Sequence, residues 1–294
     1  MDPRSALRPA AALTLNALVW GLSWWPFREL HAAGLHPLWA TAVIYALAAA
    51  ALGTWRRGVW REVATHPAQW VLVVASGATN AAFNWAVTIG DVVRVVLLFY
   101  LMPLWAVLLA RWLLGEPLHR GALARVGLAL AGAATVLWPD GGGWPLPHTL
   151  ADALGVLGGF TFALNNVMLR REAARSGSAR AAAMFAGGVL VAGGVALVLT
   201  WAGRVGAPPP PAPDWIAGAV GLGVLFLAAN LALQYGAARL PAQATAVIML
   251  TEVLFASASA IALGAGTLGW RVVAGGALIV AAAVLAARER PAPP

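Results

Sequence analysis

Long apolar runs follow one another along the whole chain and leave only short polar gaps between them. A bilayer core about 30 Å thick is crossed by about 20 apolar residues in an α-helix. Because lipid cannot hydrogen-bond the backbone, uninterrupted runs of this length must be helical, and the period-two alternation of barrel strands is not seen. The sequence therefore predicts an all-α membrane protein with ten transmembrane helices, at residues 9–29, 37–55, 68–89, 94–114, 121–138, 151–169, 181–202, 215–237, 242–264 and 269–287.

The composition supports this class and excludes others. Hydrophobic residues make up 61% of the chain and charged residues 10%, and the mean hydropathy is +0.78. A soluble domain carries about 25% charged residues. The net charge of +8 does not indicate nucleic-acid binding, because the arginines lie between apolar runs rather than along one face. Cysteine is absent, which excludes disulfides and thiolate chemistry.

The distribution of arginine predicts the orientation of the chain. All 19 basic residues are arginine; fifteen lie at one set of helix ends and four at the other, together all 19. Arginine collects on the cytoplasmic side of membrane proteins. We therefore expect a multi-pass protein with both termini in the cytoplasm, and the four external arginines are Arg28, Arg94, Arg204 and Arg271.

The two halves of the chain show weak self-similarity at an offset of about 149 to 150 residues. Five helices in each half is an odd number, so a duplicated half enters the membrane upside down, as in many transporters with a central site and alternating access. We expect two inverted five-helix repeats, residues 1–147 and 148–294, around a central cavity. The matched pairs are Asn80 with Asn230, Asn84 with Gln234, Trp85 with Tyr235, Pro103 with Glu252, and Gly115 with Gly264.

Several short motifs sit at characteristic places in these helices. They are Trp20-Gly21 in the first, Pro103 with Gly115-Glu116 at the end of the fourth, Arg170-Arg171 ending the sixth, and Glu252 with Leu263-Gly264 in the ninth. In these features the chain resembles the drug/metabolite transporter superfamily, in its ten-helix EamA-type branch, and most of all YddG-type aromatic amino-acid exporters. It departs from the pattern at Ala265, where a Glu is expected after Gly264.

The resemblance covers nearly the whole chain and implies a basket-like fold. The central cavity of that fold is lined by helices 1, 3, 4, 6, 8 and 9. It also implies a transporter of the bacterial inner (plasma) membrane that needs no cofactor.

Amide side chains lie near the middle of four predicted helices. An amide offers two donors and an acceptor, which suits the ammonium and carboxylate of a zwitterion without burying net charge. The alternative is hydrogen bonding between helices, which is common in membranes. The candidate substrate-binding amides are Asn16, Asn80, Asn84, Asn166, Asn230 and Gln234.

Glu252 is the one acidic residue deep inside a predicted span. A buried charged carboxylate is costly, so it must be paired, solvated or protonated. One interpretation is proton coupling or recognition of a substrate ammonium. The other is a protonated carboxyl that bridges helices.

Deep aromatic residues offer stacking surfaces for an aromatic substrate, with ordinary helix packing as the alternative. Pro103 interrupts the hydrogen bonding of the fourth helix, and we expect a kink there that shapes the cavity. Asp91 and Arg94 lie three residues apart at an external helix end, where we expect a solvated pair, with a gate at the mouth as the alternative. The candidate aromatics are Trp20, Phe83, Tyr100, Trp105 and Phe162.

Motifs for other chemistry are missing from the sequence. There is no phosphate-binding Gly-Lys-Ser/Thr loop, no His-Glu-x-x-His and no Gly-x-Ser-x-Gly, so we expect neither an enzyme nor a metal site. We expect a monomeric secondary transporter that exports small amphipathic metabolites, chiefly neutral and aromatic amino acids. The alternatives are a drug, nucleotide-sugar or sugar-phosphate carrier, and a membrane assembly protein that transports nothing.

Overall fold

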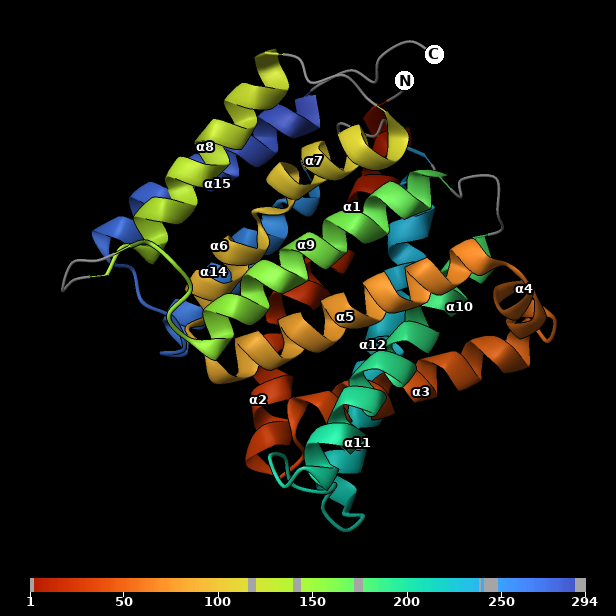
Figure 1. Cartoon of the computed structure of the whole chain (residues 1–294). Helices are drawn as coiled ribbons and strands as arrows, with labels where there is room; N and C mark the ends of the chain where they lie inside the picture. Colours follow the sequence, from red (N-terminus) through yellow and green to blue (C-terminus); the bar gives the residue numbers. More distant parts are fainter. Residues whose placement is uncertain are drawn as a thin grey trace.

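The computed structural model describes residues 3–115, 120–139, 144–171, 177–237, 239–240 and 248–288. Every regular element in these ranges is a helix, as the apolar runs predict (Figure 1). The first part of the chain forms α1 (Pro3–Leu22), α2 (Trp24–Ala32), α3 (Pro37–Trp55), α4 (Val59–Thr65), α5 (Pro67–Ile89), α6 (Val92–Phe99), α7 (Met102–Leu114) and α8 (Arg120–Leu137). The second forms α9 (Leu150–Arg171), α10 (Gly177–Gly187), the π-helical turn η1 (Gly188–Ala192), α11 (Gly193–Trp201), α12 (Pro213–Ala237), α14 (Thr251–Ala262) and α15 (Trp270–Arg288).

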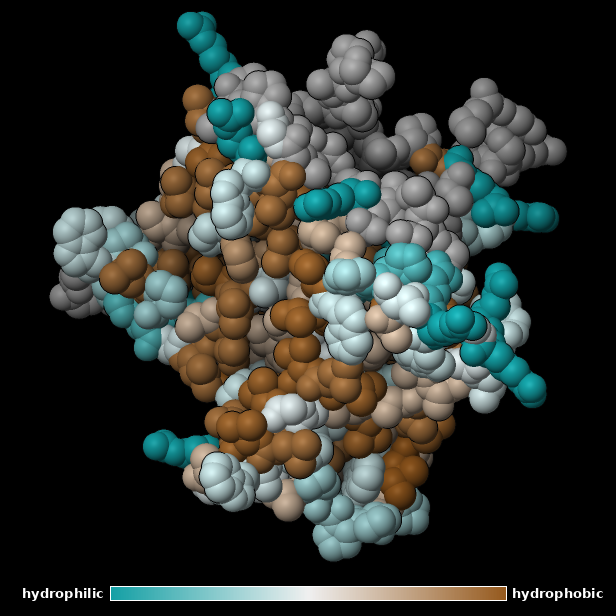
Figure 2. All heavy atoms as spheres, turned by 45° about the vertical axis from the view of Figure 1, so that its right-hand side comes forward, coloured by the Kyte–Doolittle hydropathy of each residue, from teal (hydrophilic) through white to brown (hydrophobic). Residues whose placement is uncertain are grey.

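Six helical segments of the described chain are long and apolar enough to cross a membrane. Shorter apolar helices, Leu123–Leu137, Thr251–Ala262 and Trp270–Leu285, lie in three further expected spans. Figure 2 shows apolar side chains over the middle of the visible face and hydrophilic ones toward its periphery. The six segments are Pro37–Trp55, Pro67–Ile89, Val92–Leu113, Leu150–Leu169, Gly177–Trp201 and Pro213–Leu233.

Three of the expected spans are interrupted. The first is divided at Ser23, whose hydroxyl donates to the Trp20 carbonyl oxygen at 2.8 Å. The fourth is divided at Tyr100 and Leu101, just before Pro103 in the first turn of α7, where a missing N–H group costs nothing. The ninth has a turn at Leu250, immediately before α14. The sequence indicated only the interruption near Pro103, whose side chain lies outside the described residues.

The helices α7 and α14 begin at matching positions and end within one residue of matching positions. α7 begins at Met102 and α14 at Thr251, and each is followed by a glycine with positive φ, 72° at Gly115 and 69° at Gly264. This left-handed conformation is open to glycine and strained for most other residues, and it ends helices. Both the starts and the terminal glycines are separated by the offset of 149 that the sequence indicated.

A second correspondence joins α8 to α15, which lie side by side (Figure 1). A Cβ on Gly132 would lie 2.6 Å from the Gly275 oxygen, and a Cβ on Gly275 would lie 2.6 Å from the Gly132 oxygen. The Cβ on Gly132 would also meet Ile279, four residues after Gly275. The Cβ on Gly275 would in turn meet Val136, four residues after Gly132. The close contacts of these two glycines are therefore reciprocal.

Polar contacts between helices hold together one end of the molecule, which contains the α2–α3, α5–α6, α8–α9 and α14–α15 links. We call it the external end, following the orientation expected from arginine. There Arg94 of α6 pairs with Asp152 of α9 through two bonds: Nε donates to Oδ1 at 2.7 Å, and Nη2 donates to Oδ2 at 3.2 Å. Arg94 also donates to the Val136 carbonyl at 2.7 Å.

The expected pairing of Asp91 with the Arg94 side chain is therefore wrong. Asp91 Oδ1 instead accepts from the backbone N–H of Arg94 at 2.9 Å and caps α6. Its Oδ2 accepts from the backbone N–H and hydroxyl of Thr267 at 2.8 and 2.9 Å. The two residues thus connect α6 to different neighbours rather than to each other.

Candidate functional site

The two internal interruptions, before α7 and before α14, meet inside the molecule. Tyr100 lies in the turn between α6 and α7, and Glu252 lies in the first turn of α14. The Tyr100 hydroxyl donates to Glu252 Oε2 at 3.5 Å, and Tyr100 is buried. The contact joins residues 152 positions apart in the sequence. A carboxyl and a phenol from the two halves thus form one polar junction in an apolar core.

The helix α1 closes one side of this junction through close backbone contact. A Cβ on Gly21 would lie 2.9 Å from the Glu252 carbonyl oxygen and 2.8 Å from the Phe255 Cβ. One turn beyond Gly21, the Trp24 indole donates to the Ser259 hydroxyl at 3.0 Å. The small residue at position 21 therefore lets α1 approach the first turn of α14.

Aromatic rings surround the Tyr100 side of the junction, with Phe99 at their centre. Its ring centroid lies 4.8 Å from that of Phe83, 5.3 Å from that of Phe162 and 6.1 Å from that of Tyr100. Three aromatics proposed from the sequence are thus brought together by a fourth. Phe99 was not singled out because it stands in an apolar run with nothing polar to mark it.

Trp105 lies one turn into α7 and packs edge-on against Phe160, with ring centroids 5.5 Å apart. Its indole nitrogen is buried and has no hydrogen-bond partner among the described residues. Buried N–H groups nearly always have a partner, so this donor is suited to a water or a ligand.

A second aromatic cluster lies between α1, α3 and α12, away from the Phe99 rings. Trp20 stacks on Phe226 with centroids 4.5 Å apart, and Phe226 packs 5.9 Å from Tyr45. The Tyr45 hydroxyl donates to Asn80 Oδ1 at 2.5 Å, and the Asn80 amide donates to the Ser76 carbonyl at 2.7 Å. Asn80 is therefore hydrogen-bonded both to α3 and within its own helix α5, and the Trp20 ring packs on α12.

The other amides also serve mainly in helix contacts. Asn16 donates to the Ala229 carbonyl at 2.7 Å, Asn84 to the Thr41 hydroxyl at 3.1 Å, and Asn230 to the Met184 sulfur at 3.8 Å. The carbonyl oxygens of Asn16 and Asn84 are buried without a described hydrogen-bond partner. Asn166 is exposed, and the side chain of Gln234 lies outside the described residues.

Among the twelve candidates, the structure therefore separates one group from the rest. The junction group consists of Phe83, Tyr100, Phe162 and Glu252, gathered around Phe99, with Trp105 on the edge of the same core. Its chemistry is one carboxyl, one phenol, one free indole N–H and several ring faces. Such a group can bind a cation or an ammonium beside an apolar or aromatic moiety.

Comparison with known proteins agrees with this architecture. The sequence profile of the EamA-like transporter family matches residues 8–138, which contain α2 to α8 and most of α1. One crystal structure is similar over 95% of this chain and 96% of its own, with a TM-score of 0.59 and 20% sequence identity, and so shares the fold. No curated protein matches the chain.

Proposed function

We propose that this protein is a secondary transporter of the EamA-like, drug/metabolite transporter type. The match of residues 8–138 to that family supports the class, and the apolar helices support a membrane location. We place it in the bacterial inner membrane, as a monomer with both termini in the cytoplasm. This orientation rests on the arginine distribution, and α1 begins and α15 ends on the same side of the molecule (Figure 1).

The proposed architecture is ten spans in two inverted halves, residues 1–147 and 148–294. The matching bounds and terminal glycines of α7 and α14 support a duplication. The reciprocal contacts of Gly132 and Gly275 support a two-fold relation between α8 and α15. The helix pairs fit the same relation, because α5 packs on α9 as α12 packs on α1, and α7 packs on α9 as α14 packs on α1.

The substrate site in this proposal is the junction between the interrupted helices, and the Tyr100–Glu252 contact is the observation that carries it. Transporters commonly bind substrate where interrupted helices meet near the bilayer midplane. A carboxyl in that position suits a substrate ammonium or a coupled proton, and the Phe99 rings suit an apolar or aromatic side chain. Neutral amino acids, aromatic ones included, combine both features.

Sugar phosphates and nucleotide sugars fit this junction poorly. A phosphate needs several cationic groups, whereas the junction presents a carboxyl and ring faces. A cationic or neutral drug remains the second candidate substrate, because it can use the same carboxyl and rings. In a membrane assembly protein that transports nothing, the Tyr100–Glu252 contact would only bridge helices.

The test is flux of labelled neutral amino acids into liposomes that contain the purified protein, compared with flux of a nucleotide sugar. We expect phenylalanine or a related amino acid to move and the nucleotide sugar to stay outside. Glu252→Gln should slow this flux by about tenfold or more, since loss of a charge-assisted contact is worth about 1.5–3 kcal/mol. Tyr100→Phe should have a smaller effect in the same direction.

Glu29→Gln provides a matched control. Glu29 is an exposed carboxylate on α2 that accepts a hydrogen bond from the Trp25 indole at 3.1 Å, and this contact involves no residue of the junction. It should leave flux unchanged. Equal flux in Glu252→Gln and Glu29→Gln would remove Glu252 from the mechanism, and no flux of any amino acid would reject the substrate class.

A further inference from the structure

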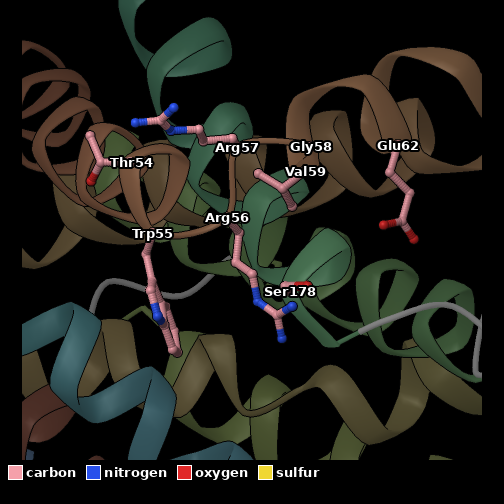
Figure 3. Close-up of a pocket in the computed structure, with 8 residues that line it drawn as sticks. All are labelled: Thr54, Trp55, Arg56, Arg57, Gly58, Val59, Glu62 and Ser178. Atoms are coloured by element: carbon pink, nitrogen blue, oxygen red, sulfur yellow. The ribbon is translucent and has the colours of Figure 1, made fainter.

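A polar hollow lies at the opposite end of the molecule from the Arg94–Asp152 pair. It is formed by the last turn of α3, the start of α4 and the first turn of α10 (Figure 3). Its volume is about 550 Å³, and Trp55, Arg56, Arg57, Glu62 and Ser178 are among the residues that line it. None of these residues belongs to the junction described above.

The walls of the hollow are fixed by packing. Val59 and Val63 of α4 are buried in the core, and the Trp60 indole lies so close to α3 that a Cβ on Gly53 would overlap its nitrogen. The connecting turn is closed by a hydrogen bond of 3.0 Å from the Val59 N–H to the Arg56 carbonyl. The backbone that carries Arg56 is therefore held in place.

Arg56 brings a positive charge into this hollow. Its side chain extends toward Ser178, whereas Arg57 extends to the other side of the chain and Glu62 lies beyond Val59 (Figure 3). The one ion pair in the described part of the chain is Arg94–Asp152, so the Arg56 guanidinium has no carboxylate partner there. Ser178 lies in the first turn of α10.

An apolar stripe on α3 leads to the same place. Leu47, Ala51 and Trp55 are spaced four residues apart, so they share one face of the helix, and all three are exposed. Trp55 is 67% exposed, and the Arg56 guanidinium lies 5.9 Å from its ring centroid. Tryptophan beside arginine at a helix end is typical of the interface between hydrocarbon and headgroups.

We propose that this hollow binds the phosphate of an anionic phospholipid headgroup through Arg56, with an acyl chain along Leu47, Ala51 and Trp55. A guanidinium matches a phosphate with paired, charge-assisted hydrogen bonds. A free phosphate compound shares that chemistry. The apolar stripe favours the lipid, because a soluble phosphate would leave the stripe unused. This site is independent of what the protein transports.

The test is native mass spectrometry of the purified full chain in a neutral detergent. Short-chain phosphatidylglycerol, phosphatidylcholine and glycerol phosphate are titrated in separate arms. We expect one phosphatidylglycerol to bind more tightly than either of the others. Arg56→Gln should weaken that binding by about tenfold, the size of one charge-assisted contact.

Arg61→Gln is the matched control, because Arg61 is an exposed arginine on α4 that does not line the hollow. It should change the affinity by less than about twofold, and both variants should keep the thermal midpoint of the parent. Equal losses in the two variants would mean general attraction to a basic surface and would overturn the proposal. Glycerol phosphate binding as tightly as the lipid would overturn the assignment to lipid.

Discussion

The arginine side chains at the two ends of the molecule make different contacts. At the external end, Arg28, Arg94 and Arg271 each donate to an acceptor on another segment: Arg28 to the Val87 and Gly90 carbonyls, Arg94 to Asp152, and Arg271 to the Trp138 carbonyl. At the opposite end, Arg56, Arg57, Arg61 and Arg111 are exposed. Three of the four external arginines therefore join segments, whereas Arg204 is exposed; at the opposite end these four arginines face outward, whereas Arg125 is buried.

The difference indicates which end is closed. Arg94–Asp152 joins α6 to α9, and Asp91–Thr267 joins the start of α6 to the link before α15. The Val92 backbone N–H also donates to the Ala265 carbonyl at 3.1 Å, which is a second contact between the start of α6 and the link before α15. If the protein works by alternating access, these contacts must break when the junction opens to the external side.

The largest expected effect comes from removing the bidentate ion pair. Arg94→Gln leaves the Asp152 carboxylate, whose side chain is 2% exposed, with only backbone donors from His148 and Thr149. Loss of one partner of a buried pair costs about 3 kcal/mol. A thermal-shift measurement in detergent should show a fall of roughly 8 °C in the unfolding midpoint. An unchanged midpoint would mean that the pair does not stabilise the external end.

A smaller loss is expected from Asp91→Ala. This change removes the cap of α6 and both bonds to Thr267, which together are worth about 1–2 kcal/mol. Asp91→Asn retains an oxygen that can cap the helix, so it should recover part of the loss. The two midpoints, measured side by side, give the stabilisation that depends on the carboxylate. If they coincide with that of the parent, the bonds to Thr267 contribute nothing.

The pH dependence of the external end should be smaller still. His36 lies in the α2–α3 link, where burial, with a further contribution from nearby His31, lowers its pKa from 6.5 to about 4. Its ring accepts from the Leu38 N–H at 3.3 Å, which protonation of Nδ1 would prevent. The unfolded chain takes up the proton first, so stability present above about pH 6.5 is lost as the pH falls toward 4. His36→Asn can still cap α3 but cannot titrate, and it should show a flatter thermal midpoint between pH 7 and pH 4.5.

The smallest effect is expected at the opposite end. Arg111 is exposed near the end of α7, and Arg111→Gln should change the free energy of unfolding by no more than about 0.5 kcal/mol. Arg111→Gln and Arg94→Gln each remove one positive charge, from opposite ends of the molecule, so the two variants are compared in the same thermal assay. Similar losses in both variants would contradict the contrast between the ends.

Apolar patterning predicts most of this fold because lipid leaves a long apolar segment no alternative to helix. The expected spans coincide closely with α3, α5, α8 and α9. The interruptions at Ser23 and Leu250 were not predicted, since nothing in local composition marks them. The matching glycines 115 and 264 were predicted as a pair, and both have positive φ in the structure.

Side-chain partners were harder to predict than helices. Asp152 and Arg94 are 58 residues apart, so their pairing depends on how α6 meets α9. The deep amides of Asn16, Asn80 and Asn84 could be identified from sequence, but whether a neighbouring helix forms hydrogen bonds with them depends on the packing. Glu252 was identified because a lone carboxyl in an apolar run is conspicuous, and its partner Tyr100 follows from the fold.

The central claim is that this is a transporter whose external end must open. The chain has no cysteine, so Asp91→Cys combined with Thr267→Cys introduces the only two thiols, at side chains now 2.9 Å apart between Oδ2 and Oγ1. The measurement is amino-acid flux into liposomes before oxidation, after oxidation, and after reduction of the disulfide. The account predicts flux that falls to background when the disulfide forms and returns when it is reduced. Full flux through the oxidised, cross-linked protein would contradict it.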